Sequence, residues 1–179
     1  MQNPRPVAIA LGSNLGDRAA LLGAARERIA ADIAPLEGVS RIYETDPVGP
    51  PQPCYLNQVV LLRSAASPEA ILATLLGIEH ALGRVRTAPA RHGPRRIDCD
   101  LLLCGETERR ASRLTLPHPR MSQRAFVLVP LVELLPDWRH PREGWTVRER
   151  LACVGRAGVR PWRGEAPADG SRGTGSADA

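Results

Sequence analysis

Residues 97–103 read IDCDLLL, a stretch in which acidic and apolar side chains alternate before an apolar end. Successive side chains of a strand point to opposite faces, so this pattern predicts a strand with Asp98 and Asp100 on one face and apolar neighbours in the core. A rise of about 3.3 Å per residue sets the two carboxylates roughly 5 to 7 Å apart. Two acids this close repel each other unless a cation lies between them.

A basic segment and a helix precede this strand. Residues 84–96 are rich in Arg, Pro and Gly and contain no acidic side chain. Before them, Ser67 is suited to cap a helix, Pro68 to open it and Glu69 to stabilise its first turn. Apolar residues then recur at helical spacing up to Gly83, which predicts a helix over residues 67–83.

The N-terminal part supplies the other elements of the fold. Residues 7–11 are predicted to form a strand and residues 17–34 a helix, with further strands at 39–43 and 59–62. Four prolines in residues 46–53 exclude regular pairing there. The resulting order, βαββαβ, predicts a ferredoxin-like α+β fold in which two helices cover one face of an antiparallel sheet.

The C-terminal part is predicted to add a strand at 114–116, a helix at 123–134 and a short helix at 146–154. Residues 163–179 are rich in Gly, Ser, Ala and Asp, so we expect a disordered tail with nothing to bury. The chain has 179 residues, the size of one domain, and we expect that domain to span residues 1–162.

Composition narrows the class of protein. The chain is 43% hydrophobic and 24% charged, it lacks the run of about 20 apolar residues that a membrane helix needs, and the apolar run at residues 7–11 is too short for a secretion signal. We therefore expect a cytoplasmic protein with no membrane contact. Its four cysteines form no CxxC pair and have no histidine at zinc spacing, which indicates neither a disulfide framework nor a zinc site.

The net charge is +5, and all 24 basic residues are arginine. A Walker-type phosphate loop requires lysine, so any nucleotide must be bound in another way, and arginine binds phosphate bidentately. Codon usage in a GC-rich genome is an alternative cause of the overall arginine excess.

Five arginines fall within the thirteen residues 84–96, directly before the acidic pair. An oxygen-only pair of carboxylates suits Mg²⁺, which binds one or two carboxylates together with substrate phosphates. Taken alone, the acids are also compatible with a solvated strand edge, and the arginines with non-specific nucleic-acid contact. Together they favour electrostatic catalysis on a polyphosphate, because aspartates repel a nucleic-acid backbone.

Between residues 7 and 160 the chain resembles the 6-hydroxymethyl-7,8-dihydropterin pyrophosphokinases of folate biosynthesis. The resemblance rests on seven motifs in the family's order: ALGSNLGD (10–17), YETDPVG (43–49), YLN (55–57), GRVR (83–86), GPRRIDCDL (93–101), LPH (116–118) and RAF (124–126). It implies transfer of the pyrophosphoryl group of ATP to the hydroxymethyl group of the dihydropterin, with release of AMP.

The resemblance also implies roles for individual residues. Asp98 and Asp100 would hold two Mg²⁺ ions, and Arg84 and Arg95 would be the catalytic-loop arginines that close over the triphosphate. The implied nucleotide contacts, besides these two arginines, are Glu79, Arg113, Thr115, His118 and Arg124. The implied pterin contacts are Thr45, Val48, Tyr55, Asn57 and Phe126. Without the family, His118 is also compatible with a capped turn, and Tyr55 and Phe126 with the core.

The chain departs from the family pattern at several positions. His92 stands where a tryptophan that covers the pterin is common, and the loop between Arg86 and Arg95 is one residue longer. Thr87 replaces a frequent lysine, and Pro119 replaces an aromatic residue. Cys99 replaces an aliphatic residue between the aspartates, and we expect it to act as a small hydrophobe in the core.

Two other functions are compatible with parts of the sequence. The isoelectric point of about 9.7 is compatible with a small nucleic-acid-binding domain, but only 3% of residues are aromatic, too few for a base-stacking platform. A magnesium-dependent phosphohydrolase would use water in place of the pterin. We expect a monomer whose partners are ATP and the pterin, with no nucleic acid.

Overall fold

The computed structural model describes residues 3–47, 51–84 and 93–164. In chain order its elements are β1 (Arg5–Ser13), α1 (Arg18–Asp32), β2 (Leu36–Val39), β3 (Tyr43–Thr45), β4 (Tyr55–Ser64), α2 (Pro68–Ala81), β5 (Asp98–Cys104), β6 (Arg109–Ala111), β7 (Leu114–Leu116), a 3-10 turn (Met121–Gln123), α3 (Ala125–Leu134), α4 (Val147–Val154) and β8 (Val159–Pro161).

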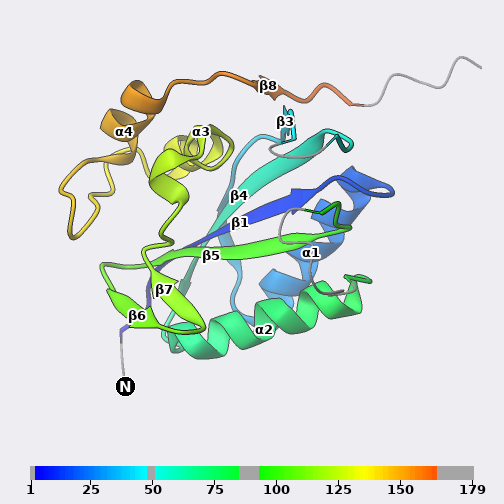
Figure 1. Cartoon of the computed structure of the whole chain (residues 1–179). Helices are drawn as coiled ribbons and strands as arrows, with labels where there is room; N and C mark the ends of the chain where they lie inside the picture. Colours follow the sequence, from blue (N-terminus) through cyan, green and yellow to red (C-terminus); the bar gives the residue numbers. More distant parts are fainter. Residues whose placement is uncertain (1–2, 48–50, 85–92, 165–179) are drawn as a thin grey trace, which may run out of the picture.

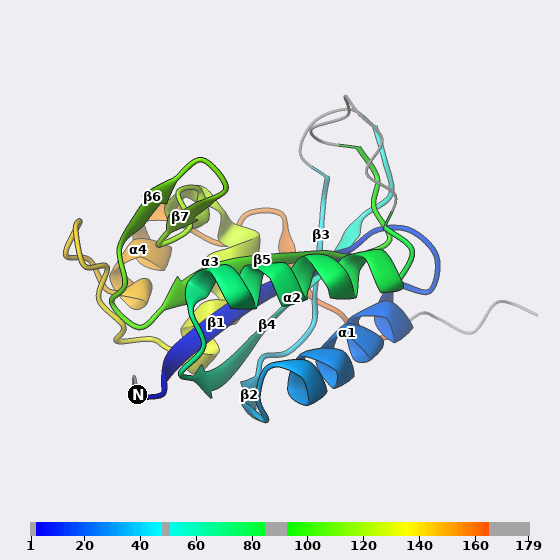
Figure 2. The same ribbon diagram turned by 90° about the horizontal axis from the view of Figure 1, so that it is seen from below.

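The main sheet has the strand order β5-β1-β4-β3-β8, with β2 also paired to β4, and every pairing is antiparallel. The strands and the first two helices follow one another as βαβββαβ, with β2 and β3 in place of the second predicted strand. The antiparallel sheet with two helices on one face confirms the predicted ferredoxin-like α+β fold (Figure 1). A separate hairpin, β6–β7, lies beside β5 and α2 (Figure 2).

The strand predicted at residues 39–43 is instead two short strands, because Ser40 interrupts the ladder. The Ser40 hydroxyl accepts a hydrogen bond from the backbone N–H of Val59 at 3.0 Å, and the Ser40 carbonyl accepts one from the Gln58 side chain at 2.7 Å. A serine side chain that bonds to the backbone competes with regular pairing. The chain therefore leaves β4 after β2 and returns to it as β3.

The predicted helices form with ends close to those expected. Asp17, Ser67 and Thr146 cap α1, α2 and α4 through their side chains, as their positions before helical patterns predict. The helix predicted at 123–134 is split, because Arg124 has an extended backbone (φ −112°, ψ 104°) between the 3-10 turn and α3.

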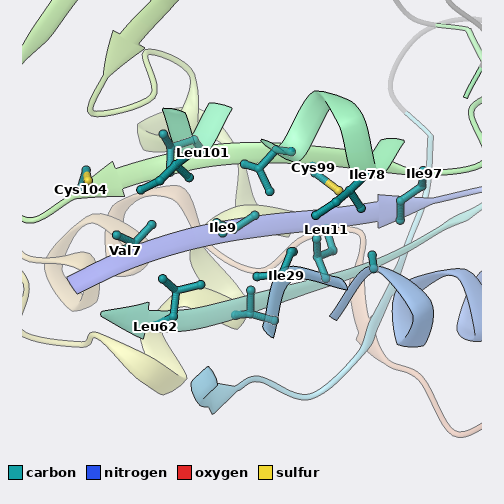
Figure 3. Packing of buried hydrophobic residues seen from close by; sticks show 14 of the residues in the cluster. Val7, Ile9, Leu11, Ile29, Leu62, Ile78, Ile97, Cys99, Leu101 and Cys104 are labelled. Carbon is teal, nitrogen blue, oxygen red and sulfur yellow. The ribbon is translucent and has the colours of Figure 1, made fainter. Parts of the chain in front are cut away.

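The sheet is buried on both faces. Val7, Ile9 and Leu11 of β1 pack against α1 and α2, together with Cys99 and Leu101 of β5 (Figure 3). The other face packs against α3 and α4 through a second cluster that includes Ala8, Val59, Leu102 and Leu128. The predicted pair of helices on one face is therefore confirmed, and α3 and α4 add a third layer.

The tail predicted from residue 163 lies almost wholly outside the described residues, so its disorder and the single domain at 1–162 stay predictions. Among the helices that the structure describes, none is both long and apolar enough to cross a membrane.

Ile9 is fully buried between β1 and the two helices beneath it. We expect Ile9→Ala to lower the free energy of unfolding by about 2 to 5 kcal/mol, because it removes buried methyl groups and leaves a cavity. Val39→Ala is the control, since Val39 is 43% exposed and should change stability by less than about 0.5 kcal/mol. Urea denaturation followed by circular dichroism measures both, and equal effects would contradict the packing described.

Candidate functional site

The register of β5, β1 and β4 places two acids and one amide around small residues of β1. Gly12 pairs with Asp98 on one side and Asn57 on the other, and Ala10 pairs with Asp100. A Cβ atom on Gly12 would lie 3.3 Å from Asn57 Oδ1 and 3.9 Å from Asp98 Cβ. The small side chains therefore leave a hollow on the face of the sheet opposite α1 and α2.

Asp98 is held by two arginines from the ends of the basic segment. The guanidinium of Arg84 contacts one carboxylate oxygen, and Arg95 Nη1 lies 2.7 Å from the other. Burial favours the neutral acid, but these two ion pairs outweigh it and hold the pKa of Asp98 below its usual value. Asp98 is therefore ionised at neutral pH.

Glu79 supports this arrangement from α2. It is only 2% exposed, forms an ion pair with Arg84, and accepts a hydrogen bond from the backbone N–H of Cys99 at 2.8 Å. It thereby ties the last turn of α2 to β5 and places Arg84 beside Asp98. Cys99 is buried against α1 and α2, as predicted, and burial raises the pKa of its thiol well above the usual value.

Asp100 lies in a different electrostatic environment. Arg124 is its nearest cation, with Nη1 3.9 Å from the carboxylate. Burial and then the charge of Asp98 raise the pKa of Asp100 to about 6. A cation bound between the two acids would relieve this repulsion, so the pair fits a magnesium site that substrate phosphates complete. Within the described residues, no group of three or more His, Cys, Asp or Glu is placed to hold a metal ion.

Asn14 connects the basic segment to the proline-rich loop. Its Oδ1 accepts a hydrogen bond from the backbone N–H of Arg95 at 2.8 Å, and its Nδ2 donates to Gln52 Oε1 at 3.1 Å and to the Pro53 carbonyl at 3.2 Å. Asn14 is 2% exposed. The turn after β1 therefore fixes the backbone of Arg95 and the end of the proline-rich loop together.

A cavity of about 570 Å³ opens over Gly12 between β1, β3, β4 and the start of α3. Thr45, Tyr55, Asn57 and Phe126, which were predicted for the pterin, line it together with the aspartate pair. Asn57 Nδ2 donates to Thr45 Oγ1 at 2.7 Å, which orients the amide so that its oxygen faces the hollow above Gly12. Tyr55 and Phe126 are partly exposed and border this cavity, so they are not purely core residues.

A second cavity, of about 790 Å³, lies between α2, β5 and the β6–β7 hairpin. The residues predicted for the nucleotide line it: Glu79, Arg84, Arg95, Arg113, Thr115, His118 and Arg124. The two cavities meet at a wall made of Arg95, Asp98, Asp100, Arg120 and Arg124.

His118 is both a turn residue and a cavity residue. Its Nδ1 accepts a hydrogen bond from the backbone N–H of Arg120 at 3.2 Å, so its Nε2 carries the proton and remains for a ligand. Burial and the charges of Arg124 and Arg120 lower the pKa of His118 to about 4. At neutral pH it is therefore an uncharged hydrogen-bond donor.

Several cavity residues were missed in the sequence. Ala10 and Gly12 form the floor of the first cavity, Gly158 and Val159 at the start of β8 form part of its wall, and Arg120 borders both cavities. The alternation of small residues in β1 was a usable signal for the floor. Nothing local marks β8, which reaches the site only through its pairing with β3. The implied pterin contact Val48 and the departures from the family pattern at Thr87 and His92 fall outside the described residues.

Comparison with known proteins identifies the family. The family model described as 7,8-dihydro-6-hydroxymethylpterin-pyrophosphokinase (HPPK) matches residues 8–136. This chain belongs to that family. It is 42% identical over 156 residues to the 2-amino-4-hydroxy-6-hydroxymethyldihydropteridine pyrophosphokinase of Synechocystis sp., a match that covers 86% of this chain and 78% of the relative. The enzyme of the same name from Methylorubrum extorquens is 43% identical over 154 residues, covering 84% and 94% of the two chains.

Solved structures of the HPPK family agree in fold. An HPPK-DHPS crystallised in complex with substrates has a TM-score of 0.67 and 14% identity, covering 85% of this chain and 43% of that one. Wild-type Plasmodium falciparum HPPK-DHPS has a TM-score of 0.66 and 13% identity, covering 86% and 45%. At this identity the likeness shows the fold, and this chain spans less than half the length of either protein.

The hydrogen bond to Nδ1 and the low pKa of His118 are open to a direct test. We expect the free protein to show His118 as the Nε2–H tautomer at pH 7 and to titrate it near pH 4, against about 6.5 for an unperturbed histidine. Long-range ¹H–¹⁵N correlation spectra across a pH series measure both, and His118→Gln assigns the signal. A midpoint at or above 6.5 would contradict the burial and charge described.

Proposed function

We propose that this chain transfers the β,γ-pyrophosphoryl group of ATP to the hydroxymethyl group of 6-hydroxymethyl-7,8-dihydropterin and releases AMP. The observation that carries the proposal is the meeting of two cavities at one wall of aspartates and arginines in a member of the HPPK family. Such a layout suits a reaction with two substrates, because the acceptor and the donor occupy separate cavities and react where these join.

The acceptor fits the cavity over Gly12. Asn57 is fixed by Thr45 and offers its amide oxygen, which suits the ring N–H donors of a pterin. Tyr55 and Phe126 offer aromatic surface at the border of the same cavity. In this arrangement the hydroxymethyl group extends towards Asp98.

ATP fits the second cavity, whose wall supplies arginines from three parts of the chain, namely Arg84, Arg95 and Arg124. Guanidinium groups bind phosphate oxygens bidentately, and neutral His118 donates through Nε2. In the free protein Arg84 and Arg95 contact Asp98. We propose that both turn to the triphosphate when the substrates bind, so that one set of ion pairs replaces another.

The reaction is a displacement at the β-phosphorus. The hydroxymethyl oxygen forms a bond to that phosphorus and its proton passes to solvent water. The bond to the oxygen bridging the α- and β-phosphates breaks, so that AMP leaves with the electron pair. We propose that Asp98 and Asp100 hold two Mg²⁺ ions. These would neutralise phosphate charge and acidify the attacking hydroxyl. The arginines position the triphosphate and balance its charge.

The proposed function is tested by incubating the protein with ATP and Mg²⁺, with and without the dihydropterin, and by measuring AMP and the pterin diphosphate. We expect both products in equal amounts and only when the pterin is present. AMP formation without pterin would indicate a phosphohydrolase instead.

The monomeric state and the cytoplasmic location also stay predictions. Light scattering after size-exclusion chromatography tests the monomeric state.

Asp98→Asn and Asp100→Asn should each lower kcat by about 100-fold or more, because each removes a charge that holds the metal at the reacting phosphates. Circular dichroism checks that the variants remain folded. Asp137→Asn is the matched control, because it makes the same change in an 81% exposed side chain outside both cavities. Near-normal turnover of either test variant with Mg²⁺ would overturn the metal assignment.

Gly12→Val should weaken dihydropterin binding by about tenfold or more and leave ATP binding nearly unchanged. The added side chain meets Asn57 Oδ1 at the floor of the acceptor cavity, and overfilled sites cost about 1 to 3 kcal/mol. Gly77→Ala is the control, because a Cβ there meets nothing within 4 Å. Calorimetric titration with each substrate separates the two effects, and equal losses for both would contradict the placement of the pterin.

A further inference from the structure

Arg120 lies at the junction of the two cavities and borders both. Its backbone is held in place because its N–H donates to His118 Nδ1 and its carbonyl accepts from the Gln123 N–H at 3.3 Å, directly before the 3-10 turn. Its side chain is exposed. A long cationic side chain is thus anchored at its base and presented where the cavities join.

Arg120 differs from Arg95 and Arg124, the other arginines of the shared wall, in its contacts with acidic side chains. Arg95 forms an ion pair with Asp98, and Arg124 faces Asp100. Within residues 3–47, 51–84 and 93–164, no hydrogen bond or ion pair of the Arg120 guanidinium is present. Its charge instead acts on the neighbouring Arg124 guanidinium, which it repels, and on His118, whose neutral form it favours.

An anion would relieve this repulsion. Arg120, Arg124 and His118 together offer two guanidinium groups and one neutral N–H donor around the end of the wall, whereas Asp100 is the only acid that Arg124 contacts there among the described residues. Guanidinium groups bind phosphate oxygens through paired hydrogen bonds. The surplus of positive charge is therefore suited to a phosphate group that arrives with the substrate.

We propose that Arg120 binds the pyrophosphoryl group itself, both in ATP and in the pterin diphosphate. The inference rests on the proposed function, in which this group alone passes from one cavity to the other. A side chain that borders both cavities can keep contact with it before and after transfer. Arg120 therefore contacts neither the AMP part of the donor nor the pterin ring.

Calorimetric titration in Mg²⁺ tests this with four ligands: a non-hydrolysable ATP analogue, AMP, the dihydropterin and the pterin diphosphate. Arg120→Ala should weaken the ATP analogue and the pterin diphosphate by about 10- to 100-fold, the range expected for a lost charged hydrogen bond. AMP and the dihydropterin should change by less than about twofold. The affinities of Arg120→Lys for these two ligands should lie between those of Arg120→Ala and the wild type. Lysine keeps the positive charge but lacks the planar guanidinium that forms paired hydrogen bonds.

Arg110→Ala is the matched control, because Arg110 is an exposed arginine of β6 that borders neither cavity. It removes the same charge from a side chain outside both cavities and should leave all four affinities unchanged at 0.15 M salt, because salt weakens the effect of an exposed charge that does not contact the ligand. Equal effects of Arg110→Ala and Arg120→Ala would reduce the role of Arg120 to net charge and overturn the proposal.

Other outcomes also overturn it. Unchanged affinity for both the ATP analogue and the pterin diphosphate would show that Arg120 does not bind the transferred group. A loss of affinity for only one of these two ligands would mean that Arg120 acts in only one cavity. An equal loss of affinity for AMP would mean that Arg120 contacts the AMP part of ATP. The AMP assay on the wild type runs in parallel, so failure of the proposed function is recognised separately.

Discussion

β1 is hydrogen-bonded to β4 along one edge and to β5 along the other, and its alternating side chains serve two purposes. Val7, Ile9 and Leu11 anchor α1 and α2, whereas Ala10 and Gly12 face the opposite side and leave space there. Because a slip of one residue would exchange these faces, the register that buries the core also sets Asp98 and Asn57 on either side of Gly12. Core and site are thus fixed by the same pairing.

The charged groups of the site form ion pairs with one another. Asp98 forms ion pairs with Arg84 and Arg95, and Glu79 of α2 forms a further ion pair with Arg84. Isolated ions are costly to bury, whereas paired and hydrogen-bonded ions are tolerated. In the proposed reaction, phosphates would pair with the arginines and a metal ion with the aspartates, so these groups could exchange contacts without leaving a buried charge unpaired.

The acid pair, the capped starts of α1, α2 and α4, and the alternation of strands with the first two helices were predictable because each depends on neighbours in the chain. Alternation placed Asp98 and Asp100 on one face, and Ser67 with Pro68 marked the start of α2. The interruption at Ser40 was not predictable, because it depends on hydrogen bonds to Val59 and Gln58 of another strand. The same holds for β8, which is only three residues long and is defined by pairing with β3.

The arginines show most clearly which features the sequence predicts and which depend on the tertiary structure. All 24 basic residues are arginine, so composition cannot separate an arginine that pairs with Glu69 on the surface from one that borders two cavities. The sequence by itself determined the helices, the long strands of the sheet, the family and the carboxylate pair, since these follow from local periodicity and motifs. Only the tertiary structure decided which arginines are already neutralised and which face a cavity, because burial and ion pairing depend on residues distant in the chain.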